Sequence, residues 1–135
     1  MRIFRVHRGD DRGVAAVEFA LISVPLLTLI YGGIAFGFTL NAQETATQLA
    51  REGARAAAIC GPPPATGCDQ TAKNRITAAT PAGFTVDWSN TTVSTCASGT
   101  GDAYVVVETH PPLDFPPFLT SGTAIRGKAT TPCGG

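Results

Sequence analysis

The chain has 135 residues and carries 10 Lys and Arg against 10 Asp and Glu, so its formal net charge is zero. A balanced charge gives no reason to expect nucleic-acid binding, because proteins that bind nucleic acids gather basic residues on one surface. Much of the 44% hydrophobic content lies in one apolar run and in alanine. The roughly 95 residues after that run allow one small domain and no more.

A basic leader occupies residues 1–13. It contains Arg2, Arg5, Arg8 and Arg12, whereas the first basic residue after the apolar run is Arg51. Basic residues that flank a membrane span stay on the cytoplasmic side, and this rule counts Lys and Arg rather than net charge. We therefore expect a cytoplasmic N-terminus and export of everything that follows the run.

The apolar run covers residues 14–40, and Glu18 is its only charged residue. A helix of this length rises about 40 Å, enough to cross a hydrocarbon core of about 30 Å with some tilt. The run predicts one transmembrane helix in contact with lipid, and it is longer than the apolar region of a cleaved secretory signal. Pro25 removes the N–H that would bond to the carbonyl of Leu21, which predicts a bend.

The helix is expected to continue into water over residues 41–60, before Gly61 and Pro62 end it. Alanine recurs at every fourth position there, at Ala42, Ala46, Ala50, Ala54 and Ala58. Such a row predicts a seam of small side chains that lets a helix or a sheet approach the backbone closely. The alternative is that alanine simply favours the helix.

Residues 61–135 change to a pattern rich in β-branched and aromatic residues. We predict a short helix over 69–79 and strands over 84–88, 91–96, 103–110 and 123–131, with hairpin turns at 89–90 and 98–102 and a rigid loop over 111–117. The expected fold class is α+β. A long N-terminal helix, transmembrane in its first half, would pack its soluble second half against a small antiparallel sheet.

Four cysteines, Cys60, Cys68, Cys96 and Cys133, follow the span, on the side where the orientation implies an oxidising compartment. They allow three pairings, among which sequence alone does not choose. We favour Cys60 with Cys68, closing a short loop after a helix, and Cys96 with Cys133, tying the chain's end to an earlier strand. A zinc site is the alternative, but the spacing lacks paired C-x-x-C units and a histidine pair, so we expect no metal and no cofactor.

The border between leader and span carries the most specific pattern: Gly13, four small or apolar residues, then Glu18 and Phe19. A charge within a span costs roughly 2.5 to 3.5 kcal/mol, so Glu18 is a functional candidate. The pattern resembles the cleavage region of prepilins of the tight adherence (Tad) branch of type IV pili. Over residues 12–59 the chain looks like the TadE-like pseudopilins, or minor pilins, of that system.

This resemblance implies a pilin-like fold and cleavage by a prepilin peptidase between Gly13 and Val14. Gly13 lacks a Cβ, so a protease can approach its backbone, and we expect it to interrupt regular structure before the helix. By the same resemblance, Glu18 would meet the amino group of a neighbouring subunit. The implied partners are the peptidase, other pilin and minor pilin subunits and the Tad assembly platform. The implied location is the bacterial inner membrane and the extracellular pilus, with roles in pilus biogenesis, adhesion or secretion.

No motif points to catalysis. His7 lies in the leader, and His110 precedes two prolines without a nucleophile motif or a carboxylate pair to serve it. Gly99 and Gly101 are not followed by the Lys and helix of a phosphate loop. The alternative function is an uncleaved, membrane-anchored binding protein of the cell envelope with the same topology. Cleavage after Gly13 distinguishes it from the pilin.

Overall fold

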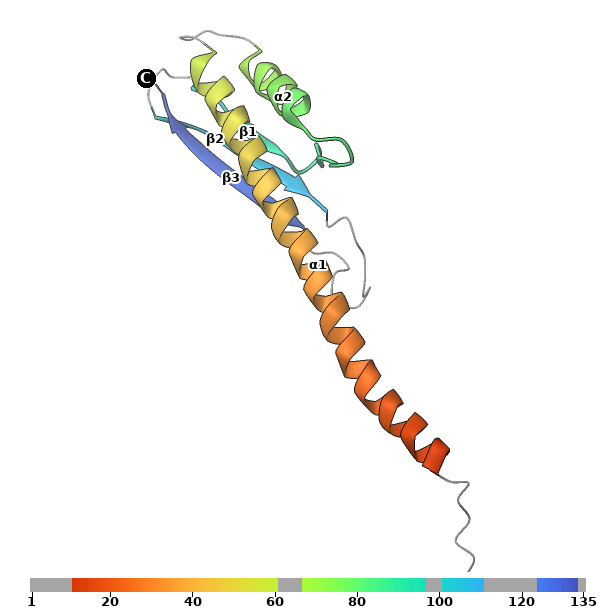
Figure 1. The fold of residues 1–135 in the computed structure, drawn as a ribbon. Helices are drawn as coiled ribbons and strands as arrows, with labels where there is room; N and C mark the ends of the chain where they lie inside the picture. The colour runs from red at the N-terminus through yellow and green to blue at the C-terminus, as the bar shows by residue number, and fades with distance from the viewer. Residues whose placement is uncertain (1–10, 61–66, 97–100, 111–123, 134–135) are drawn as a thin grey trace, which may run out of the picture. The chain divides into compact units, whose positions relative to one another are not determined.

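The computed structural model describes residues 11–60, 67–96, 101–110 and 124–133 (Figure 1). The chain divides between Phe36 and Gly37 into two units. We call residues 1–36 the apolar unit and residues 37–135 the sheet unit. Helix α1 (Asp11–Ile59) contributes to both.

The apolar unit consists, as far as it is described, of the first part of α1. Among the described residues, α1 is the one helix long and apolar enough to cross a membrane, and no part of its most apolar stretch is buried within the protein. Its hydroxyls bond within the helix: Thr28 Oγ1 donates to the Val24 carbonyl at 2.8 Å, and Ser23 Oγ to that of Ala20 at 3.1 Å. These two hydroxyls therefore have hydrogen-bond partners within the helix itself, which is what an apolar environment would require. The helix runs through Pro25, and the bend expected there stays a prediction.

The sheet unit combines the second part of α1 with helix α2 (Cys68–Ala79) and a small antiparallel sheet. Over the described residues the sheet has three strands, β1 (Thr92–Ser94), β2 (Asp102–Thr109) and β3 (Ile125–Pro132), in the order β1-β2-β3. In Figure 1 α1 lies along one face of this sheet. The predicted α+β class, with a long helix packed on a small antiparallel sheet, is confirmed.

The core of the sheet unit lies between α1 and β2. Side chains alternate across a strand, and Val105 and Val107 of β2 are fully buried in a cluster with α1 and with Ile76 of α2. A second, smaller cluster joins Ala57, Ala72 and Ala103. Apart from Leu49, the residues that α1 contributes to these clusters are alanines. Close approach of the backbones therefore adds to the stability that the larger side chains supply.

The alanine row of α1 faces this core. Ala42, Ala46, Ala50 and Ala54 are buried, whereas Ala58 is half-buried. A step of four residues advances about 400° around a helix of 3.6 residues per turn, so the row drifts by about 40° at each step. At the end of the helix Ala57 has moved into the buried position instead.

Helix and sheet approach each other very closely at Gly127 of β3. A Cβ placed there would lie 2.2 Å from the carbonyl carbon of Ala46 and 2.4 Å from the backbone nitrogen of Thr47. Only a residue without a side chain fits against the backbone at this distance. Gly53 of α1 similarly leaves room for Ile76, whose Cδ1 would be 2.7 Å from an added Cβ.

Some predicted elements differ from those observed. The helix over 69–79 is confirmed, and three predicted strands occur with shifted ends, the one over 91–96 shortened to three residues. The turn predicted at 89–90 does occur, over residues 88–90, but it does not connect two strands of the sheet. The strand predicted over 84–88 is wrong. This segment runs beside the end of β2 but makes one ladder-like bond there, from the Asp87 N–H to the Glu108 carbonyl at 2.8 Å. The Asp87 side chain instead holds the following turn through Ser89, a local alternative to strand pairing.

The cysteines pair as Cys60 with Cys68 and Cys96 with Cys133, with Cα atoms 5.5 and 5.7 Å apart. Both distances suit a disulfide, and these are the pairs favoured from the sequence. The first joins the end of α1 to the start of α2, and the second joins the segment after β1 to the end of β3. Residues 1–10 of the leader, residues 98–100 of the turn expected over 98–102 (with Gly99) and the rigid loop expected over 111–117 lie outside the described residues.

We predict that Gly127→Ala destabilises the sheet unit by more than about 3 kcal/mol, because the added Cβ meets backbone that cannot rotate away. The measurement is denaturant unfolding of the detergent-solubilised chain, followed by the fluorescence of Trp88, its single tryptophan. Thr130→Ala is the matched control on the exposed side of the same strand and should cost less than about 0.5 kcal/mol. A wild-type unfolding midpoint for Gly127→Ala would contradict the close approach.

Candidate processing and assembly site

The motif formed by Gly13, Glu18 and Phe19 lies in the first turns of α1. Val14 and Glu18 are four residues apart, so they occupy the same face of the helix about one turn from each other. Val14 is 64% exposed and Phe19 74% exposed. Glu18 is also exposed, and none of the described residues forms an ion pair with it. The carboxylate is thus open to a group from outside this chain.

Gly13 lies inside α1, which begins at Asp11. The expectation that this glycine interrupts regular structure is therefore wrong. The N–H groups of the first turn have no partner within a helix in any case, and a glycine costs only about 1 kcal/mol relative to alanine in a helix interior. A Cβ added at Gly13 would have no atom within 4 Å, so the backbone is open to approach.

Small residues mark a second open face farther along α1. Gly32, Gly33 and Gly37 would each accept a Cβ without any neighbour within 4 Å. Among the residues that the structure describes, nothing packs against them, in contrast to the buried alanines that follow. A bare glycine surface on an apolar helix permits another helix to approach closely.

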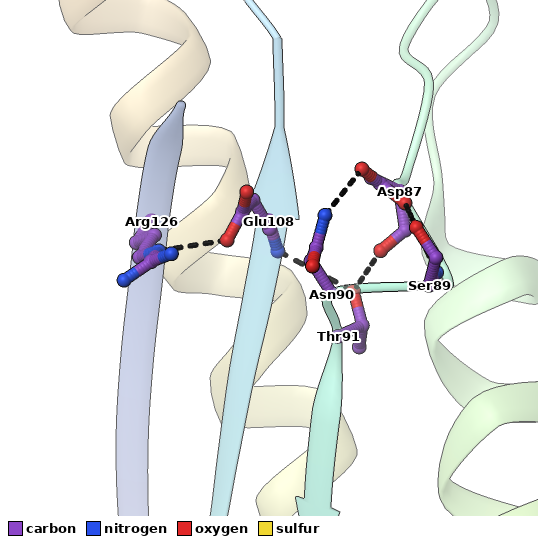
Figure 2. Close-up of polar contacts among 6 residues, drawn as sticks. All are labelled: Asp87, Ser89, Asn90, Thr91, Glu108 and Arg126. Atoms are coloured by element: carbon purple, nitrogen blue, oxygen red, sulfur yellow. Dashed lines mark hydrogen bonds and ion pairs between the residues drawn. The ribbon is translucent and has the colours of Figure 1, made fainter. Parts of the chain in front are cut away.

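A turn of polar residues, 87–91, lies next to β2 in the sheet unit (Figure 2). Asp87 Oδ1 accepts hydrogen bonds from the backbone N–H and the hydroxyl of Ser89, and Oδ2 accepts one from Asn90 Nδ2 at 3.0 Å. The Thr91 hydroxyl donates to the Asp87 carbonyl at 2.7 Å. The side-chain hydrogen bonds from Ser89 and then Asn90 hold the pKa of Asp87 below its ordinary value of 3.8, with a smaller contribution from the nearby His110.

An ion pair joins β2 to β3 beside this turn (Figure 2). Arg126 Nε donates to Glu108 Oε2 at 2.7 Å, and Glu108 is only 5% exposed. The two residues are direct cross-strand partners in the register, and the Glu108 N–H donates to Thr91 Oγ1 at 3.4 Å. This ion pair was not predicted from the sequence. Opposite charges near the ends of two strands predicted to be antiparallel were the available signal.

A groove of about 320 Å³ opens at one end of the sheet unit. It is lined by α1, by the loop 81–85 and by the end of β2: Phe38, Asn41, Ala42, Thr45, Pro81, Ala82, Gly83, Phe84, Thr85, Thr109 and His110. His110 is exposed there. Within the described ranges no three His, Cys, Asp or Glu side chains are grouped as metal ligands would be.

Comparison with known proteins matches one part of the chain. Residues 13–55 match a family model described as TadE-like protein. The match begins at Gly13, includes Glu18 and Phe19 and ends within the buried part of α1, so it covers less than half of the chain. The resemblance predicted from the sequence is confirmed over this range. No curated protein and no solved structure matched the chain.

We predict that Asp87→Asn lowers stability at neutral pH and that this loss shrinks at acid pH. The native pKa of Asp87 lies below 3.8, so its carboxylate stabilises the fold above that pH, and the stabilisation is lost as pH falls through the native pKa. Unfolding midpoints of wild type and variant at pH 7 and pH 3 test this. Ser89→Ala, which removes the largest cause of the shift, should show a smaller effect of the same sign. An equal difference at both pH values would contradict the role of the charge.

Proposed function

We propose that this chain is a minor pilin of a Tad pilus system, cut by a prepilin peptidase between Gly13 and Val14. The match of residues 13–55 to the TadE-like family carries the proposal, because it begins at the cleavage motif. That family is a structural, non-enzymatic kind of protein, so we assign the chain no catalytic activity. The processed subunit acts in pilus biogenesis, and through it in adhesion or secretion.

The proposed organisation has four parts. The leader over 1–13 stays in the cytoplasm and is removed, and residues 14–40 cross the inner membrane. Residues 41–60 continue the helix outside, and residues 61–135 form an exported domain. Two observations support export: the basic leader, and cysteines within bonding distance of each other, since disulfides persist in oxidising compartments.

Glu18 is the proposed assembly residue. A lone carboxylate in the hydrocarbon core is costly, and no described residue of this chain offsets it. Cleavage would create an amino group at Val14, four residues away, or about 6 Å along the helix axis. A neighbouring helix displaced by about that distance would place its new N-terminus beside Glu18 and form an ion pair out of water. The bare glycines at Gly32 and Gly33 leave room for such a neighbour.

One observation favours the second candidate, an uncut membrane-anchored envelope protein. The backbone at Gly13 is helical, two residues after α1 begins, whereas proteolysis concentrates at exposed, irregular segments. In that protein, Glu18 would extend toward the membrane surface rather than meet a neighbour.

We predict that the chain isolated from membranes begins at Val14 when the prepilin peptidase is present and at Met1 when it is absent. Intact mass and N-terminal sequencing without reduction measure this, and two disulfides lower the mass by that of four hydrogen atoms. Gly13→Leu should block the cut, whereas Ala16→Leu, inside the same helix and away from the scissile bond, should permit it. A Met1 start in both strains would favour the uncut anchor.

A second variant separates assembly from processing. We predict that Glu18→Gln is cut normally but associates with other pilin subunits about a hundredfold more weakly, since leaving the partner charge unpaired costs roughly 3 kcal/mol. Co-purification of detergent-extracted subunits measures the association. Glu44→Gln removes an exposed carboxylate from the same helix and should leave association unchanged. Equal association of Glu18→Gln and wild type would remove Glu18 from the assembly site.

A further inference from the structure

We propose that the loop 81–85 of the sheet unit binds the phospholipid surface, as a shallow membrane contact separate from the span. This inference rests on the proposed membrane span, because the loop lies beside the residues that would end that span. The contact involves Pro81, Ala82 and Gly83, which are exposed, with Trp88 close behind in the chain. The partner is the headgroup layer of the bilayer.

The loop lies beside the last residues of the predicted span. The groove at this end of the sheet unit is lined on one side by Phe38 and Asn41 of α1 and on the other by the loop 81–85. Phe38 belongs to the run predicted to cross the membrane, and Asn41 is the first residue after it. The loop therefore lies beside the helix at the level where the apolar run gives way to polar residues. All of these residues belong to the sheet unit.

The loop and the residues around it contain no charged side chain. No charged residue occurs between Arg75 and Asp87, although the exposed parts of that segment would tolerate charge if water surrounded them. Trp88 follows and is 42% exposed. Tryptophan is enriched at the headgroup level of membranes, where its ring is partly buried and its N–H stays in a polar layer. An exposed, uncharged loop that is followed closely in the chain by such a residue suits this layer better than open solvent.

The loop is also held in place. Phe84 packs against the core, and its N–H donates to the Pro81 carbonyl at 3.1 Å. The Thr109 hydroxyl donates to the Thr85 carbonyl at 2.6 Å, and Asp87 bonds to the Glu108 carbonyl. Gly83 takes a φ of +85°, which turns the chain so that Pro81 to Gly83 form the tip. A fixed tip loses little conformational entropy when it meets a surface.

The test uses depth-dependent fluorescence quenching on the full-length chain in phosphatidylcholine and phosphatidylglycerol vesicles. Because all four cysteines are paired, Ala82→Cys introduces one thiol that can be labelled with an environment-sensitive dye. Nitroxide is placed on the lipid headgroup or deep in the acyl chain. Thr130→Cys is the matched control, since Thr130 pairs with Tyr104, five residues along β2 from Thr109, or about 17 Å away. Phe19→Cys reports the span.

The expected result is quenching of the Ala82→Cys dye by headgroup nitroxide at least about twofold stronger than that of the Thr130→Cys dye, with the Phe19→Cys dye quenched best by the deep nitroxide. Quenching at Phe19→Cys with equal, weak quenching at the other two sites would overturn the loop contact and keep the span. A blue-shifted but unquenched dye at Ala82→Cys would mean that protein covers the loop, which also overturns it. Absence of quenching at Phe19→Cys would overturn the span and the loop contact together.

Discussion

The close contact between the backbone of α1 and strand β3 is the constraint on which the sheet unit depends. At Gly127 the sheet comes so near to Ala46 that a single added carbon would collide with the helix backbone. Few large apolar side chains fill this core, so dispersion between closely packed small groups has to supply much of its stability. The alanine row of α1 and Gly127 of β3 together permit this close approach, because neither has a bulky side chain between the two backbones. Helix α2 packs against the same helix and sheet through Ile76 and Ala72, and the Cys60–Cys68 disulfide ties its start to the end of α1.

A single helix carries two surfaces of opposite kind. Before Asn41 its apolar side chains are exposed, and after Asn41 its small side chains are buried under the sheet. In the first part none of the described residues covers these side chains, and the proposed function assigns lipid and neighbouring helices to that role. In the second part the chain covers its own helix. Under the proposed function, small residues would serve association between subunits at Gly32, whereas at Ala46 they serve folding within one subunit.

Polar interactions and disulfides secure the edges of this small unit rather than its centre. The Arg126–Glu108 pair joins two strands, and the Asp87 turn fixes the segment that crosses the end of β2. Cys96 and Cys133 hold the two ends of the sheet segment together. Because the groove and the loop 81–85 lie next to this polar turn, the same interactions that complete the fold also set the surface beside the end of the predicted span.

The sequence by itself determined whatever depends on local pattern and chemistry. It was enough for the long apolar helix, for the α+β class, for the helix over 69–79 and for the TadE-like resemblance that starts at Gly13, since periodicity, charge placement and a short motif are local properties. The strand expected over 84–88 does not form because the Asp87 side chain accepts hydrogen bonds from the turn that follows it. Such local side-chain hydrogen bonds compete with strand pairing, and β-propensity does not take them into account.

Tertiary structure alone decided the features that join residues distant in the chain. Nothing in the sequence distinguishes Gly127 from any other glycine in a strand. Only the tertiary structure shows that it lies against the backbone of Ala46, where a side chain would not fit. The Glu108–Arg126 pair depends on strand register, and the groove at Phe38 depends on where the loop 81–85 returns to the helix. Register and return path are set by the packing of the whole unit, so no local pattern could specify them.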